Sequence, residues 1–344
     1  MHMRLSDAAD CRALLRSGSR SFAAASLLLP ARVRRPATLL YAFCRVADDA
    51  IDGQGATAAG GAAALAALRH RLDRAYAGDP LPDPVDRGLA LLVTRHGLPR
   101  ALPEALLEGF AWDAAGRRYA TLPDLTGYAV RVAGTVGVMM ALLMGVRRPE
   151  LLARACDLGI AMQFSNIARD VGEDARAGRL YLPLDWLAEA GIDAEAWLAR
   201  PVFTPALGAV VARLLDEAAR LYARADPGIA GLPWACRPGI AAARALYAGI
   251  GQEVRRRGGD SVSGRAVVPG PRKAALLLTG LAGLRRAAAD LSPPVPEAAA
   301  LLAEVTPWPV RAAAPRWHDI GARTAWVLAL FERLERRDLM QRGR

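Results

Sequence analysis

Apolar residues recur along the chain with the spacing of an α-helix almost throughout. Leu65, Leu68 and Leu72 follow this spacing, and a longer stripe follows it over residues 207–221. Alanine, leucine and arginine dominate the chain and favour helices, whereas alternating runs of β-branched residues are nearly absent. The helical stretches run mostly ~12 to 22 residues, which is ordinary for globular helices. The pattern predicts an all-α protein.

Proline and glycine clusters predict where these helices end. They lie at residues 80–84, 99–103, 201–205, 227–233 and 293–296. No repeat period occurs, and no shift in composition marks a linker before about residue 290. We therefore expect one helical catalytic domain over residues 1–290. A separate helical extension is expected over residues 291–344, either packed on that domain or facing a membrane.

The composition narrows the class of protein. The chain of 344 residues is 53% hydrophobic and 23% charged, which excludes an intrinsically disordered protein. Its net charge of +11 suits nucleic acid, an anionic membrane surface or a diphosphate substrate. The basic residues are spread along the chain and aromatic residues make up only 6%, so no basic tail or base-stacking platform is evident. We expect no nucleic-acid partner.

Cysteine usage and hydropathy indicate where the protein works. Cys11, Cys44, Cys156 and Cys236 form no CxxC pair, which argues against a zinc site and suits a reducing cytoplasm. Residues 1–10 lack the apolar core of a secretory signal. The longest uncharged stretch, 132–146, is shorter than the ~18 to 20 apolar residues that span a bilayer. We expect a soluble or peripheral cytoplasmic protein.

Two apolar helices carry acidic residues at helical spacing. Asp48 and Asp52 are four residues apart, so their carboxylates project from one face of a helix. Asn166, Asp170 and Asp174 repeat this spacing over two turns. Like charges at this spacing repel each other unless a cation lies between them. Because every donor is an oxygen, the set selects Mg²⁺ or Mn²⁺ over zinc.

Ion pairing within the helices is the alternative to a metal site. Arg45 is placed to neutralise the first acidic group, and Arg169 and Arg176 are placed to neutralise the second. The presence of two such motifs, each in an apolar helix, favours the metal interpretation. Two facing acidic helices would hold a diphosphate through several bridging ions, with water and phosphate completing each shell.

The flanking residues fit a diphosphate with a hydrophobic chain. Arg45, Arg169, Arg265 and Lys273 are available to neutralise a leaving diphosphate. The small and apolar run over residues 132–140 suits either the wall of a cavity that excludes water or plain core packing. On the sequence alone we expect plain core packing.

Three segments resemble the signatures of the squalene/phytoene synthase family, most of all the bacterial phytoene synthases of carotenoid pathways. They read YAFCRVADDAID at 41–52, QFSNIARDVGED at 163–174 and GRLYLP at 178–183. The resemblance covers roughly residues 8 to 285. It implies an all-α isoprenoid-synthase bundle with a central cavity and two facing aspartate motifs.

The resemblance also implies the reaction. Two geranylgeranyl diphosphates would condense head to head to prephytoene diphosphate, which rearranges to phytoene and diphosphate. No NADPH is expected, because the nearest dinucleotide pattern, Gly249-Ile-Gly251, lacks a third glycine and a preceding strand. Small residues after Phe22 and at Thr38 favour a twenty-carbon substrate.

The family's functional positions carry over to this sequence residue by residue. The implied metal ligands are Asp48, Asp52, Asn166, Asp170 and Asp174. Catalytic roles are implied for Asp48, Asp52, Asp170, Arg45, Tyr41 and Arg169. The implied substrate-binding residues are Gly18, Ser19, Arg20, Ser21, Phe22, Tyr41, Arg45, Tyr128, Val132, Gly134, Gln163, Arg169, Tyr247, Arg265 and Lys273. Residues 259–265 resemble a family loop near the diphosphate.

Other functions remain as alternatives. A squalene or dehydrosqualene synthase would use farnesyl diphosphate instead, and a catalytically silent, membrane-associated assembly factor would have lost its aspartates. Near the C-terminus, an apolar stripe from Trp326 to Leu334 is flanked by arginines, a pattern typical of a helix that lies on a membrane or packs on the bundle. We expect weak association with the inner face of the cell membrane and contact with neighbouring carotenoid enzymes.

Overall fold

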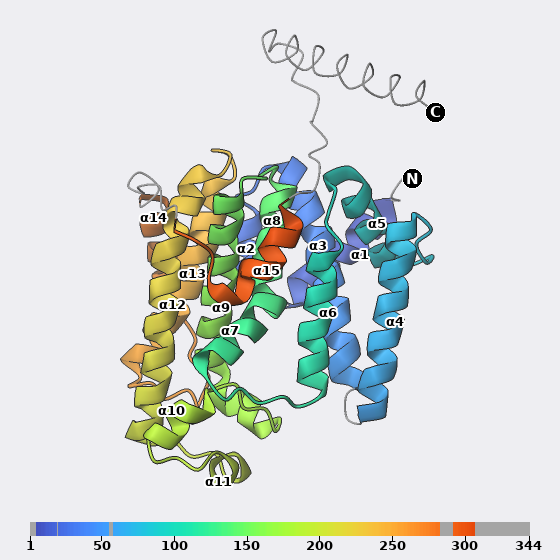
Figure 1. The fold of residues 1–344 in the computed structure, drawn as a ribbon. Helices are drawn as coiled ribbons and strands as arrows, with labels where there is room; N and C mark the ends of the chain where they lie inside the picture. The colour runs from blue at the N-terminus through green and yellow to red at the C-terminus, as the bar shows by residue number, and fades with distance from the viewer. Residues whose placement is uncertain (1–4, 19, 55–57, 283–291, 307–344) are drawn as a thin grey trace, which may run out of the picture. The chain divides into compact units, whose positions relative to one another are not determined.

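The structure is a computed structural model, and it describes residues 5–18, 20–54, 58–282 and 292–306. Within these ranges the chain forms helices and connecting turns without a β-strand, so the all-α prediction is confirmed (Figure 1). The first half contains α1 (Leu5–Gly18), α2 (Arg20–Ser26), α3 (Ala31–Gln54), α4 (Ala58–Ala77), α5 (Pro84–His96), α6 (Ala101–Ala114), α7 (Leu122–Ala129), the π-helical turn η1 (Val130–Gly134) and α8 (Thr135–Leu143). The second half contains α9 (Pro149–Arg176), α10 (Leu184–Glu189), α11 (Ala194–Ala199), α12 (Pro205–Gly231), α13 (Arg237–Arg256), α14 (Gly270–Ala282) and α15 (Pro296–Val305).

Short polar side chains begin several of these helices. Asp83 accepts a hydrogen bond from the Val85 backbone N–H at 2.8 Å, and Pro84 occupies the first position of α5. Thr121 forms a reciprocal capping box with Asp124 at the start of α7. Gly97 ends α5 with φ of 59°, a left-handed conformation that glycine adopts without strain. Local chemistry therefore sets these helix boundaries.

The predicted helix break at residues 227–233 is wrong in its first half. Helix α12 continues through Pro227 to Gly231, and the turn to α13 follows it. A Cβ at Gly228 would collide with the side chain of Arg154 on α9, so the two helices pack closely just beyond the proline. This packing stabilises the helix beyond the point where proline removes a backbone donor.

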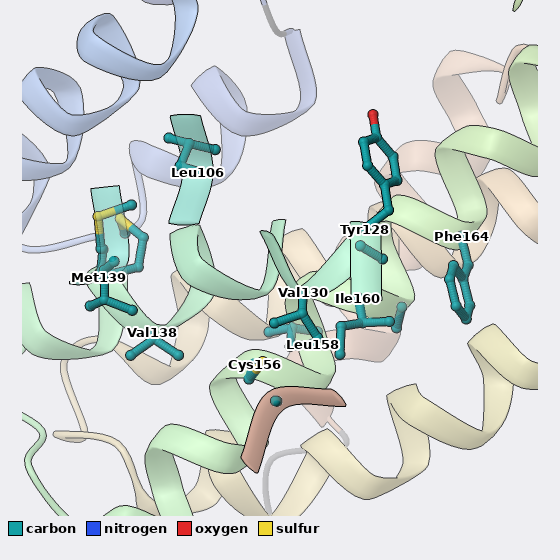
Figure 2. Packing of buried hydrophobic residues seen from close by; sticks show 14 of the residues in the cluster. Leu106, Tyr128, Val130, Val138, Met139, Cys156, Leu158, Ile160 and Phe164 are labelled. Carbon is teal, nitrogen blue, oxygen red and sulfur yellow. The ribbon is translucent and has the colours of Figure 1, made fainter. Parts of the chain in front are cut away.

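Helix α9 is the centre of the bundle and packs against α12, α8, α13 and η1. Glycines allow the closest approaches: a Cβ at Gly159 would strike the Ala133 carbonyl, and one at Gly137 would strike the Ala155 carbonyl. Figure 2 shows Val130 of η1, Val138 of α8, and Cys156 and Ile160 of α9 within the apolar core. The backbones of η1, α8 and α9 thus form one rigid wall.

One run in the described chain, Leu122–Leu143, is long and apolar enough to cross a membrane by composition. Two thirds (67%) of its most apolar window is buried inside the protein. It comprises α7, η1 and α8, which cover α9, so its apolar character follows from its place in the core.

The amphipathic stripe predicted at Trp326–Leu334 lies outside the described residues. Helix α15 packs against α6, α7 and α9.

Candidate active site

A cavity of about 280 Å³ lies between α3, η1, α8, α9, α12 and α13. Its wall is almost entirely apolar and includes Val132, Val136 and Met140. Along α9 the lining runs from Leu151 to Asn166, a length of about 22 Å at 1.5 Å per residue of helix. For the run 132–140, the structure favours the cavity wall over plain core packing, since four further members of it (Ala133, Val136, Gly137 and Met140) line the space with Val132.

Apart from Arg154, the polar lining residues gather at one end, which we call the mouth. Tyr41 and Cys44 come from α3, Gln163 and Asn166 from α9, and Tyr247 from α13. Burial raises the pKa of the Tyr41 phenol. The opposite end, which we call the hydrocarbon end, includes Met144, Leu151 and Leu232.

The first acidic motif continues α3 one turn beyond Cys44. Arg45 donates to Asp49 at 3.0 Å and to Asp48 at 3.4 Å, so the ion-pair alternative does occur here. Asp52 lies within α3, and its side chain is outside the described part of the structure. Both carboxylates that contact Arg45 remain partly exposed to solvent.

The second acidic motif is more buried and is also held by arginines. The Arg169 Nε donates to Asp170 at 2.7 Å, and Arg265 reaches Asp170 at 3.0 Å and Glu173 at 3.3 Å. Burial, together with the neighbouring Asp170 carboxylate, raises the pKa of Asp174 to about 7. Two carboxylates, Asp170 and Glu173, thus share two guanidinium groups at this place, and Asp174 lies beside them.

The donor set fits divalent cations bound together with a diphosphate. The Asn166 Oδ1 atom is buried without a hydrogen-bond partner among the described residues, and Asp174 is crowded by another carboxylate. In the described ranges, no three acidic, histidine or cysteine side chains are placed to hold a metal ion by themselves. Mg²⁺ ordinarily takes one or two carboxylates and completes its shell with water and phosphate, so it does not need such a group.

An acidic residue that the sequence analysis missed lies between the two motifs. Asp113, on α6, accepts hydrogen bonds at 2.8 Å from the phenols of Tyr128 and Tyr181. Burial, with a smaller contribution from the Asp48 carboxylate, raises its pKa to about 6, although the two phenol hydrogen bonds act to lower it. Asp113 in turn raises the pKa of Asp174. Asp48 and Asp174 both interact electrostatically with this carboxylate, so Asp113 lies near both acidic motifs.

Two further residues around Asp113 were not singled out. Arg179 lowers the pKa of both Asp113 and Asp174, which places a third guanidinium near the second motif. The Tyr181 ring stacks on that of Tyr128 with centroids 5.3 Å apart. Both residues fall inside the GRLYLP segment that carried the resemblance, but no spacing rule links them to α6.

The remaining predicted positions fall into three groups. Val132 and Gln163 line the cavity beside Tyr41 and Tyr247, as the resemblance implies. Tyr128 and Gly134 are absent from the described lining: Tyr128 binds Asp113, and Gly134 packs against the Cys156 sulfur. The structure does not show contacts of Lys273 with the mouth.

The N-terminal positions are described only in part. Gly18 ends α1, and Arg20, Ser21 and Phe22 begin α2, but the structure gives no account of their side chains, and Ser19 lies outside the described residues. Ala25 of α2 packs with Ala243, which lines the cavity. Helix α2 therefore backs the cavity wall. Thr38 donates to the Arg34 carbonyl at 2.8 Å and is not among the lining residues.

Gly249 and Gly251 lie inside helix α13. A Cβ at Gly249 would meet Leu276, and one at Gly251 would meet Leu215. The two glycines therefore give room for side chains of neighbouring helices.

Comparisons with known proteins agree with this geometry. Residues 15–272 match the sequence model of a family described as squalene/phytoene synthase. The chain is 51% identical over 337 residues to the phytoene synthase of Cereibacter sphaeroides, covering 95% of this chain and 93% of that protein. It is 59% identical over 256 residues to the phytoene synthase of Rhodobacter capsulatus, covering 74% and 75% of the two chains.

A solved structure shares the fold. A dehydrosqualene synthase in complex with a ligand superposes with a TM-score of 0.74 at 31% sequence identity. The match covers 81% of this chain and 97% of that protein. This chain thus combines the helical bundle, the cavity and the two acidic motifs, and it is similar to these proteins over most of its length.

Proposed function

The chain belongs to the squalene/phytoene synthase family, and we propose that its reaction is that of a phytoene synthase in carotenoid biosynthesis. Two geranylgeranyl diphosphates condense head to head, releasing one diphosphate and forming prephytoene diphosphate. Loss of the second diphosphate, rearrangement and loss of a proton then give phytoene. Its relatives named phytoene synthase, at 51% and 59% identity, support this assignment.

The observation that carries the proposal is the long apolar cavity with a polar mouth. It extends about 22 Å along α9, enough to receive a long prenyl chain with its diphosphate at the mouth. The acidic and basic groups of both motifs lie beside that mouth, so a substrate is oriented by its two chemically different ends. This supports geranylgeranyl diphosphate as the substrate.

The charged residues have separable roles in this proposal. Asp48, Asp52, Asn166, Asp170 and Asp174 would hold Mg²⁺ or Mn²⁺, which neutralise charge on the departing diphosphate when bound. Arg45, Arg169 and Arg265 lie on the carboxylates of the two motifs, where their guanidinium groups can also bind phosphate oxygens.

The cavity wall protects the reacting carbon chain. Aliphatic side chains such as Val132, Val136 and Leu158 offer no nucleophile and exclude water from an electron-deficient intermediate. Tyr41 and Tyr247 bring aromatic rings to the mouth, where a carbocation first forms. Burial keeps the Tyr41 phenol protonated, because it raises the pKa of that group.

Product analysis tests the proposal directly. Purified protein is incubated with Mg²⁺ and either geranylgeranyl or farnesyl diphosphate, and the products are separated by chromatography. We expect phytoene from geranylgeranyl diphosphate and little product from farnesyl diphosphate. A clear preference for farnesyl diphosphate would instead make the protein a squalene or dehydrosqualene synthase.

We extend the proposal to location: the protein is cytoplasmic and peripheral to the inner face of the cell membrane. The hydrophobic substrate and product support this, as does the net charge of +11. Contact with enzymes that supply the substrate or consume phytoene belongs to the same proposal. If the stripe at Trp326–Leu334 is an anchor, deletion of residues 320–344 shifts the protein from membrane to soluble fractions; unchanged partitioning contradicts an anchoring role.

A further inference from the structure

Large apolar side chains are exposed at the end of the bundle that lies farthest from the acidic motifs. Trp234, in the turn between α12 and α13, is 81% exposed. Leu27 and Leu28, in the turn between α2 and α3, are 68% and 42% exposed. Burying such side chains on a partner removes their apolar surface from water, which favours binding.

The two turns adjoin each other. A Cβ at Gly239, in the first turn of α13, would meet the side chain of Leu29 and the carbonyl of Ala25. The Arg32 guanidinium, at the start of α3, lies close enough to the Cys236 thiol to lower its pKa against the effect of burial, which raises it. Residues near 27 and residues near 234 therefore belong to one surface.

This surface is strongly basic. Arg32 and Arg35 are exposed, and Arg237 is partly exposed. None of these three pairs with a carboxylate within the described ranges, whereas most other arginines described here have an acidic partner. The sequence contains no aspartate or glutamate between residues 27 and 47 or between residues 227 and 252. Three arginines without a carboxylate partner in the described ranges thus lie in the same two segments as three exposed apolar side chains.

The surface lies over the hydrocarbon end of the cavity. Leu232 lines that end and is two residues from Trp234. The Arg237 side chain donates a hydrogen bond to the Leu232 carbonyl at 2.8 Å. Ala37 and Leu40, nine and twelve residues beyond Leu28, line the cavity from the N-terminal half of α3. The acidic motifs occur later on α3 and α9, toward the opposite end of both helices.

We propose that this docking face, formed by Leu27, Leu28, Trp234, Arg32, Arg35 and Arg237, binds the surface of an anionic lipid bilayer. Tryptophan and leucine enter the headgroup region, and the arginines pair with lipid phosphates. The hydrocarbon end of the cavity then faces lipid, and the mouth faces water. The proposed binding to a bilayer depends only on the residues of the docking face. The advantage of turning the hydrocarbon end toward lipid, where a hydrophobic product can leave, rests on the proposed function.

A second copy of the chain fits this face less well than a bilayer does. In a two-fold dimer the same patch would meet itself, so the arginines would lie against arginines. An anionic bilayer neutralises them instead. The absence of acidic residues from both neighbouring segments leaves a self-paired interface without compensating charges.

Vesicle sedimentation tests the proposal with the full-length protein. Vesicles of phosphatidylcholine alone are compared with vesicles of equal parts phosphatidylcholine and phosphatidylglycerol, with and without added salt. We expect binding to the anionic vesicles that weakens with salt. Trp234→Ser and Arg32→Gln/Arg35→Gln should each lower the partition coefficient about tenfold. Val202→Ser and Arg200→Gln are matched controls on exposed residues near α11 and should bind like the wild type.

The readouts separate docking from catalysis. Turnover of prenyl diphosphate in detergent should be unchanged in all four variants, so a loss of vesicle binding with intact turnover supports the docking face. Equal vesicle binding by the wild type, Trp234→Ser and Arg32→Gln/Arg35→Gln overturns it. It is also overturned if sedimentation velocity shows a dimer that Trp234→Ser dissociates while vesicles bind neither form. Absence of phytoene production with normal docking would count against the proposed function alone.

Discussion

The two ends of the cavity are built from different chemistry. At the mouth, α3, α9 and the segment between α13 and α14 supply carboxylates and arginines that contact one another, such as Asp170 with Arg169 and Arg265. At the hydrocarbon end the walls are aliphatic, and the one charged lining residue, Arg154, is buried with Asp157 at 3.0 Å and Ser292 at 2.8 Å. The mouth keeps its charges accessible to a ligand, whereas the other end neutralises its charges within the fold. This difference orients an amphipathic substrate.

Removing one carboxylate at the mouth should have the largest effect. Asp170→Ala should lower kcat/KM about 10³-fold, equivalent to about 4 kcal/mol, because a group that neutralises diphosphate charge in the transition state is lost. Steady-state kinetics measures this loss. Circular dichroism measures the helical content, which should be the same as in the wild type. Asp49→Ala is the matched control, since Asp49 is exposed and contacts Arg45 beside the mouth. Equal losses in both variants would contradict a special role for Asp170.

Separating the helices that form the wall should have the next largest effect. Gly159→Ala places a methyl group against the Ala133 carbonyl and forces η1 away from α9. We expect the free energy of unfolding to fall by about 2 to 3 kcal/mol, measured by urea denaturation. Gly264→Ala is the control, because a Cβ there meets nothing within 4 Å. Similar stabilities for the two variants would show that the wall is not tightly packed.

The buried Asp113 carboxyl should make the free energy of unfolding depend on pH. Burial raises the pKa of Asp113 from 3.8 to about 6, so the folded protein keeps a proton there that the unfolded chain has already lost. The free energy of unfolding of the wild type therefore falls as pH rises from about 4 to above 6. Asp113→Asn has no carboxyl group at this position, so its free energy of unfolding does not fall for this reason. From pH 4 to pH 7 the variant should gain about 2 kcal/mol relative to the wild type, since each pKa unit is worth about 1.4 kcal/mol.

Asp260→Asn is the control for this pH dependence. Slight burial raises the pKa of Asp260, but hydrogen bonds from the Ser263 and Val262 backbone N–H groups lower it more. Its contribution to stability is therefore fully present above pH 4 and is lost only at more acidic pH. Denaturant midpoints for the three proteins at several pH values give the comparison. A flat difference for Asp113→Asn would show that the Asp113 carboxyl ionises as readily in the folded protein as in the unfolded chain.

Narrowing the hydrocarbon end should have the smallest effect. Ala155 lines the cavity between Leu151 and Gly159, so Ala155→Leu leaves less room for the far end of the longer substrate. We expect the ratio of kcat/KM for geranylgeranyl over farnesyl diphosphate to fall about tenfold. Ala199→Leu, on the exposed face of α11, should leave the ratio unchanged. An unaltered ratio in Ala155→Leu would mean that the chain does not extend past this position.

The same contrast explains what sequence reasoning found. Acidic residues at four-residue spacing in apolar helices are unusual, so Asp48 and Asp170 were found from local pattern alone. Asp113 was missed because its partners, Tyr128 and Tyr181, are 15 and 68 residues away and are brought together by tertiary packing. A single acid at the end of the apolar run Phe110–Trp112 was the signal available.

The hydrocarbon end had no such signal. Met144, Leu232 and Ile240 are ordinary core residues in sequence, and only the assembly of several helices makes them a cavity wall. The proline rule likewise failed at Pro227, because packing of Gly228 on Arg154 outweighed the local preference to end the helix. Helix class and motif placement are local properties, whereas the shape of the empty space is not.

The π-helical turn η1 has a consequence for the length of the chain at this point. It holds one residue more than a regular helical turn, between Tyr128, which binds Asp113, and the wall residue Val136. Each residue of a π-helix turns by less than the 100° of an α-helix residue, so η1 takes up its extra residue while Tyr128 and Val136 keep nearly the orientation of a regular helix. Deleting a single residue of η1 would therefore join α7 and α8 in one regular helix with the phenol and the wall still aligned. Deleting a residue within α9 would instead rotate its two ends by about 100° relative to each other and separate the acidic motif from the cavity wall.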